Sequence, residues 1–189
     1  MTPPLQGRQV YGMAPLIRFT LLALYVALVL PLPGMAPTTP GPVLWGALAF
    51  GLGIVWAITS EQVILDAEGV QLTHPSWCRW WLRRGWQLQW AQVEGLTPVA
   101  TSQGGRVFYV RTSGREGTGG SDGSKAYLLP QRVERLEEFL SHFSALSGTS
   151  TGSVARITPP WTYQLLAAMS GALIIGELLS LGHFSGRMV

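Results

Sequence analysis

The sequence is poor in charged residues and in cysteine. Only 12% of its 189 residues are charged and 47% are hydrophobic, whereas about a quarter of a soluble globular chain is charged. The single cysteine, Cys78, excludes an intrachain disulfide. Residues 37–60 carry no charge, and Glu177 is the only charged residue between Thr158 and His183. These charge-free stretches predict segments that lie in a bilayer.

The sequence also lacks the motifs of common catalytic sites. It has no HExxH, no GxSxG and no Walker loop, and its ten acidic residues form no recognisable catalytic pair. Cys78 has no CxxC partner that would indicate zinc. A net charge of +3 is too small to indicate a nucleic-acid partner. We therefore expect a protein that is not an enzyme and that holds no metal or other cofactor.

Three long apolar segments are present, at residues 16–32, 43–60 and 161–182. A helix needs roughly 20 residues to cross the hydrocarbon core, so we expect three transmembrane helices, as a hairpin over residues 16–60 and a third helix over 159–183. The alternative for the first segment is a signal peptide cleaved near Met35. The late Arg18 and the second apolar segment that follows almost at once favour a span.

Glycines in the second segment leave one question open. Gly46, Gly51 and Gly53 either let the two helices of the hairpin pack closely or are simply tolerated in lipid.

The distribution of positive charge predicts the topology. Arg8 and Arg18 precede or open the first segment, the connector 33–42 has no positive charge, and only Arg187 follows the third segment. Ten of the 13 Lys and Arg residues lie in the central region and its flanks. Because cytoplasmic loops carry the excess of positive charge, we expect the N-terminus and the central region on the cytosolic side.

The central region changes to short alternating runs, which predict one compact cytosolic domain. We place this domain at residues 61–147, between the helices and a linker at 148–158, with short tails at 1–15 and 184–189. The runs predict strands at 61–66, 70–73, 86–90, 96–101, 106–112 and 125–129. Apolar residues spaced by three and four over 131–146 predict an amphipathic helix that ends at Gly148, after a glycine-rich loop at 113–124.

Two segments carry a resemblance to a known fold. They are Trp90–Leu96 (WAQVEGL), followed by a strand, and Tyr127–Pro130 (YLLP), which leads into Val133–Phe139 (VERLEEF). Both resemble segments of bacterial membrane proteins with pleckstrin-homology (PH)-like domains. The resemblance implies an α+β membrane protein with an antiparallel β-barrel or sheet closed by a C-terminal amphipathic helix.

The layout is also similar to that of the photosystem I assembly factor family of cyanobacteria and chloroplasts. That family likewise has a hairpin of two membrane helices before a compact domain, and the segments Leu82–Trp86 (LRRGW) and Trp90–Val93 (WAQV) are similar in kind. The third apolar segment departs from the family pattern. The resemblance implies a cyanobacterial protein of the thylakoid membrane, with photosystem subunits as partners.

Residues 77–90 form the most unusual stretch, because they hold five of the eight tryptophans. We expect Trp86 and Trp90 to fill the core. Trp and Arg side chains suit both lipid headgroups and protein hot spots, so the predicted partner- or lipid-binding residues are Trp77, Arg79, Trp80, Trp81, Arg83 and Arg84. Glu177 is a second candidate, as a polar residue within a membrane segment; an interfacial role and a partner contact are both open.

These features lead to two functional hypotheses. The first is a non-catalytic, membrane-anchored scaffold or assembly factor for an integral membrane protein complex, with photosystem biogenesis as the process that the resemblance suggests. The second is a module that binds anionic membrane lipid through Arg79, Arg83 and Arg84.

Overall fold

The computed structural model of the protein describes residues 7–35, 40–82, 85–102, 105–112, 125–156 and 159–185. The chain forms two compact units. One contains residues 1–14 and 60–158, and the other contains residues 15–59 and 159–189. The glycine-rich loop 113–124 lies outside the described residues.

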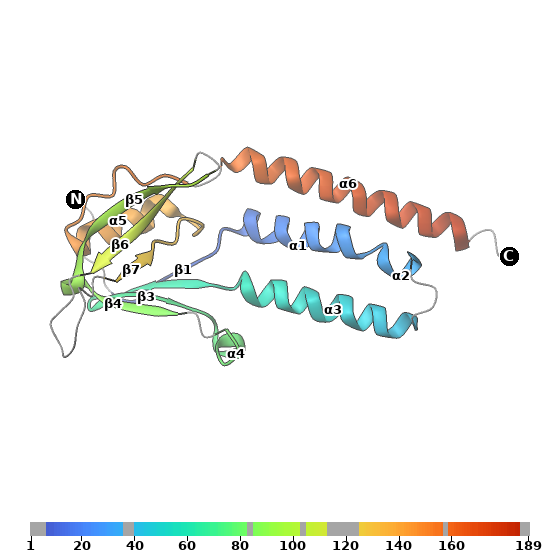
Figure 1. Ribbon diagram of the computed structural model, residues 1–189, viewed down its shortest axis with the longest axis horizontal. Coiled ribbons are helices and arrows are strands. Elements are labelled where there is room, and N and C mark those ends of the chain that lie inside the picture. The colour runs from blue at the N-terminus through green and yellow to red at the C-terminus, as the bar shows by residue number, and fades with distance from the viewer. Residues whose placement is uncertain are drawn as a thin grey trace. The chain divides into compact units, whose positions relative to one another are not determined.

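The second unit is helical. Its elements are α1 (Pro15–Val29), α2 (Leu32–Met35), α3 (Gly41–Ile58) and α6 (Pro160–Ser185). Figure 1 shows α1 between α3 and α6. Thr20 on α1 is buried, and its hydroxyl donates to Leu16 O at 2.7 Å and lies 3.3 Å from Tyr163 O on α6. On the other side of α1, the Arg18 guanidinium lies 3.8 Å from the centroid of the Trp56 ring on α3.

Two helices, rather than the expected three, are long and apolar enough to cross a membrane among the described residues. They are Gly41–Ile58 and Pro160–Ser180, judged by length and composition. The first apolar segment gives a helix of only 15 residues, about 22 Å at 1.5 Å per residue. The proline at position 31 has no N–H to donate and disfavours helical geometry in the residue before it, so α1 ends at Val29 and the chain turns into α2.

The glycines of α3 are not equivalent. A Cβ atom on Gly51 would lie 2.8 Å from Cζ of Tyr25 on α1, whereas Gly46 and Gly53 have open space at that position. The Tyr25 hydroxyl donates to Leu48 O of α3 at 3.0 Å. Of the two possibilities for these glycines, close approach therefore holds at Gly51.

The first unit contains two antiparallel sheets. Strands β1 (Gln9–Gly12), β2 (Gln62–Leu65), β3 (Gly69–Thr73) and β4 (Trp86–Gln89) form the first sheet in that order. A 3-10 turn, η1 (Trp90–Gln92), leads to the second sheet of β5 (Val93–Ala100), β6 (Arg106–Thr112) and β7 (Ala126–Leu128). The expected mixture of antiparallel strands and helices is confirmed. Among the described residues the strands form two separate sheets, so a single closed barrel is not observed there.

Strand β1 corrects one expectation, because its residues fall within the predicted N-terminal tail, 1–15. It pairs with β2 from Gln9↔Leu65 to Gly12↔Gln62, although α1, α2 and α3 lie between the two strands in the sequence. The chain then continues past Val133, where the Ala14 N–H donates to Arg132 O and the Glu134 N–H donates to Gly12 O. The N-terminal segment is thus part of the sheet domain.

The C-terminal helix of this domain, α5, runs from Leu136 to Ser147. It starts five residues later than expected, because backbone groups of residues 132–134 bond to residues 12–14 instead of forming a helical turn. Gly148 ends the helix in the left-handed conformation, with φ 68°, as expected from its position.

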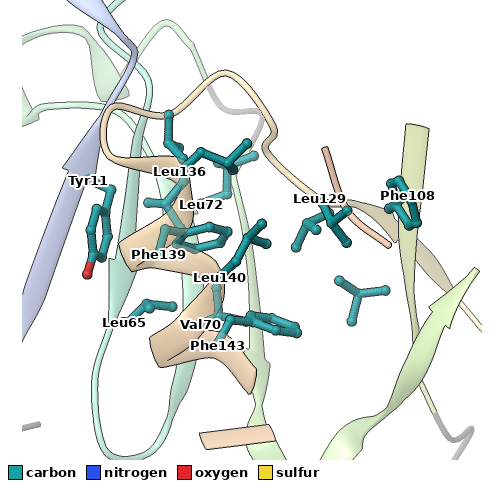
Figure 2. Close-up of a cluster of buried hydrophobic side chains, with 14 of the residues drawn as sticks. Tyr11, Leu65, Val70, Leu72, Phe108, Leu129, Leu136, Phe139, Leu140 and Phe143 are labelled. Carbon is teal, nitrogen blue, oxygen red and sulfur yellow. The ribbon is translucent and has the colours of Figure 1, made fainter. Parts of the chain in front are cut away.

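Side chains from both sheets and from α5 form one hydrophobic core. Figure 2 shows Phe139 of α5 beside Tyr11 of β1, and the rings lie edge-on with centroids 5.5 Å apart. The core members are Tyr11, Val63, Leu65, Val70, Leu72, Leu88, Phe108, Val110, Leu129, Val133, Leu136, Phe139, Leu140, Phe143 and Val154. The core therefore joins residues that precede and follow the helical hairpin.

Candidate functional site: the α4 surface

Three strand ends lie together at one end of the first sheet. The register places Gly12 opposite Gln62 and Gln62 opposite Thr73. From Gly12 the chain enters α1 after residues 13–14, and it returns from α3 to Gln62 through residues 59–61. From Thr73 it leaves the sheet to form α4 (Ser76–Arg79) and returns at Trp86. We call this the helix-linked end of the sheet.

The short helix α4 and the two residues that follow it carry three tryptophans. Cys78 is buried and Leu82, four residues later, is half-buried, so these two side chains anchor the segment to the domain. Trp77, Trp80 and Trp81 are 53%, 76% and 51% exposed. The Trp80 indole N–H donates to Trp77 O at 3.1 Å. We name Trp77, Arg79, Trp80 and Trp81 the α4 surface.

Arg79 combines this aromatic surface with a charged group. Its side chain is exposed and lines a polar cavity of about 370 Å³ together with His74 and Trp86. His74 is buried, and within the described parts of the chain its Nδ1 has no hydrogen-bond partner. Of the six predicted binding residues, four therefore lie on α4 or on the two residues that follow it. Arg83 and Arg84 lie outside the described residues.

Trp86 and Trp90 pack against the core, as expected. The Trp90 ring lies edge-on to Phe143 at 5.5 Å, and its N–H donates to Asp66 O at 2.9 Å. The Trp86 ring lies 5.4 Å from that of Tyr127. The tryptophan-rich stretch thus divides into a core part and an exposed part.

The remaining polar candidate, Glu177, lies on α6 and is half-buried. Its role stays a prediction. In the described part of the chain, no three His, Cys, Asp or Glu side chains are placed to hold a metal ion.

A second cavity was not anticipated from the sequence. It measures about 210 Å³. Its lining consists of Met13, which follows β1, Glu61 and Val63 at β2, Val107 of β6, and residues 128–133, which lead from the end of β7 toward α5 and include Gln131 and Arg132. Burial raises the pKa of the Glu61 carboxyl, and the charges of His74 and Arg132 partly offset this rise. No local motif could reveal the cavity, because its walls come from four separate parts of the sequence.

Comparison with known proteins places the chain in a cyanobacterial family. It is 38% identical over 164 residues to the "Uncharacterized protein slr0269" of Synechocystis sp., an alignment that covers 84% of this chain and 78% of that protein. The chain belongs to the same family as that protein, which supports the expected cyanobacterial origin. No family model and no solved structure matches the chain.

Proposed function

We propose that the protein is a membrane-anchored, non-catalytic scaffold that docks a partner protein through the α4 surface. The observation that carries the proposal is the exposure of Trp77 on α4 and of Trp80 and Trp81, the two residues that follow this helix. Exposed tryptophans beside an arginine have the composition of a protein-binding hot spot. Their segment also leaves the sheet at the helix-linked end, which suits recognition of a membrane-embedded partner.

Membrane anchoring is supported by the apolar surface of the helices. Only 6% of each candidate span is buried, unlike the core helix of a soluble protein. The large apolar side chains exposed on α3 and α6 include Val43, Trp45, Phe50, Trp56, Ile58, Trp161, Leu165, Met169, Leu173, Ile175, Leu178 and Leu179. In our proposal lipid covers these side chains, α1 with α2 completes a three-helix anchor, and the sheet domain lies on the cytosolic side.

The PH-like fold is part of the proposal. Four antiparallel strands, three antiparallel strands and a C-terminal helix follow one another in the order that the resemblance implies. The helical hairpin would then be an insertion between the first and second strands. Folds of this kind host unrelated functions, so the docking role rests on the α4 surface and not on the fold.

The partner complex is proposed from the family. A relative in a cyanobacterium and the layout shared with photosystem I assembly factors both support a photosystem in the thylakoid membrane. The scaffold would hold photosystem subunits during assembly.

Affinity purification tests this proposal. The tagged full-length protein is isolated from gently solubilised native membranes, and the co-purifying proteins are identified by mass spectrometry. The double variant W80A/W81A should lose the partner, whereas V99A, which truncates an exposed apolar residue on β5, should retain it. If the double variant retained the same proteins in the same amounts, the docking role would be wrong.

One observation favours a second function, binding of anionic lipid. Arg79 lines a polar cavity, and a guanidinium binds phosphate in a bidentate manner. In nanodiscs at low salt, the segment 76–82 of the full-length protein should exchange amide hydrogens more slowly with anionic than with neutral lipid. High salt and the variant R79A should each remove this difference. Equal exchange in both lipids at low salt would exclude the lipid-binding function.

A further inference from the structure

The second sheet has two outer strands, β5 and β7 (Figure 1), and the hydrogen bonds inside the sheet show which backbone groups remain on each edge. Between β6 and β7, the Leu129 N–H donates to Phe108 O, and the Thr112 N–H donates to Lys125 O. In an antiparallel ladder, such bonded pairs alternate with pairs whose N–H and C=O groups point away from each other. Every second residue of β7 is therefore turned toward the open edge.

Ala126 and Leu128 are the two residues in these outward positions. The register pairs them with Arg111 and Tyr109, between the bonded pairs of the ladder. Both residues are exposed. In the described part of the chain, the N–H of neither residue donates to another backbone group. Strand β7 thus keeps donors at two successive outward positions.

The opposite edge of this sheet is interrupted by a proline. The Thr101 N–H donates to Gly105 O just beyond β5. By the same alternation, the outward positions of β5 are Leu96, Pro98 and Ala100. Pro98 has no N–H, so it breaks the row of donors at its centre, which is a common protection of an exposed edge. The outward positions of β7 hold no proline, so β7 is the edge that can take a further strand.

Side chains beside the start of β7 favour an acidic partner. The strand has only three residues, so its few main-chain bonds need support from side-chain contacts. Arg111 lies opposite Ala126 in the register, and the small alanine leaves its guanidinium room to reach an added strand. Lys125 directly precedes β7. Both basic residues are exposed, and neither forms an ion pair within 4.0 Å with a described residue.

The other end of β7 is apolar. Leu128 is 48% exposed, lies opposite Tyr109, and lines the second cavity together with Val107. An apolar side chain placed next to Leu128 would remove this surface from water. Residues two positions apart in a strand share one face. An added strand can therefore carry an acidic residue opposite Ala126 and an apolar residue opposite Leu128.

We propose that β7 binds an extended segment of a partner protein, which joins the second sheet as a further strand and carries acidic residues close to apolar ones. Main-chain bonds at Ala126 and Leu128 hold the segment, and Arg111 and Lys125 select its acidic side chains. A second copy of this chain fits less well, because its own β7 would bring another Lys125 and no acidic residue. This edge does not depend on the α4 surface, so a scaffold that uses both holds two partners at once.

Amide hydrogen exchange of the full-length protein in detergent, followed residue by residue by NMR, tests the proposal. The probe is a short peptide in which glutamate alternates with valine, and the control peptide has lysine in place of glutamate. At about ten times its Kd, the glutamate peptide should slow exchange at Ala126 and Leu128 about tenfold. The Tyr127 amide lies on the β6 side of the strand and should change little. The lysine peptide should leave all three amides unchanged.

The variant A126P removes one outward donor without removing a bond to β6, so it should abolish the slowing at Leu128. Its matched control, A100P, makes the same change at an outward position of β5 and should respond like the wild type. Thermal unfolding shows whether each variant is folded. If A126P is not, R111E/K125E still tests the proposal, because it should bind the lysine peptide instead of the glutamate peptide.

Three outcomes would overturn the proposal. Unchanged exchange at Ala126 and Leu128 with the glutamate peptide would show that no strand is added. Equal slowing by both peptides would show that the basic residues select nothing. Slowing that grows with protein concentration in the absence of peptide would identify a second copy as the occupant. W80A/W81A should leave the effect of the glutamate peptide intact, which separates this edge from the proposed docking function.

Discussion

The hydroxyl of Tyr11 lies 2.7 Å from Nδ1 of His142, which follows it by 131 residues. The same hydroxyl donates to Oε1 of Glu138 at 3.3 Å. Tyr11 belongs to β1, ahead of the first apolar helix, whereas His142 and Glu138 belong to α5, after the last strand. These side-chain bonds add to the pairing of β1 with β2. They join the first and last elements of the sheet domain, so the N-terminal segment contributes to its stability.

The variant Y11F should lower the free energy of unfolding of the sheet domain by about 1–2 kcal/mol, because one hydroxyl and its hydrogen bonds are lost inside the domain. The measurement is denaturant unfolding of the full-length protein in a fixed detergent, followed by near-ultraviolet circular dichroism. The control Y109F removes the hydroxyl of a half-buried tyrosine on β6 and should change stability little. Equal losses in the two variants would mean that the Tyr11 bonds add nothing.

The same tyrosine predicts a dependence on alkaline pH. Burial, the charge of Glu138 and the hydrogen bond to it raise the pKa of Tyr11 from 10.0 to about 12, while Arg135 opposes the rise. The folded state thus favours the neutral phenol, so the stabilisation is complete below pH 10 and is lost as pH rises from about 10 to 12. Melting temperatures measured across this range should fall more steeply for the wild type than for Y11F. Parallel curves would contradict the shift.

The features that could be predicted from the sequence depend on patterns within a few consecutive residues. The features that could not be predicted depend on contacts between distant parts of the chain. Each strand from β2 to β7 overlaps a predicted one, because alternation is readable within a few residues. The tryptophans of the α4 surface were also predicted as a group, since they all lie within residues 77–81. Strand β1 was not, because it has only four residues and its partner follows the whole hairpin. The cavity lined by Met13, Glu61 and Gln131 was hidden for the same reason, as its walls are assembled only by the tertiary fold.

Glu61 gives a prediction at lower pH. Burial raises the pKa of its carboxyl above the usual range, although His74 and Arg132 oppose the rise. The folded state therefore favours the protonated form, and this stabilisation is lost as pH rises through the raised pKa. The variant E61Q, which is neutral at every pH, should melt at a higher temperature than the wild type at pH 8, and the difference should vanish in acid. The control E94Q changes an exposed carboxylate on β5 and should show no such difference at either pH.

The packing of α3 on α1 predicts opposite outcomes for two glycines that are two positions apart. An added Cβ at Gly51 would collide with the Tyr25 ring and displace the hydroxyl that donates to Leu48 O. Overpacking of this kind costs about 1–3 kcal/mol, so G51A should lower the melting temperature of the helical unit in detergent. At Gly53 the same methyl group enters open space, and alanine favours a helix over glycine by about 1 kcal/mol, so G53A should be neutral or stabilising. Equal effects of the two substitutions would show that the hairpin is not held by close approach at Gly51 and that these glycines are simply tolerated in lipid.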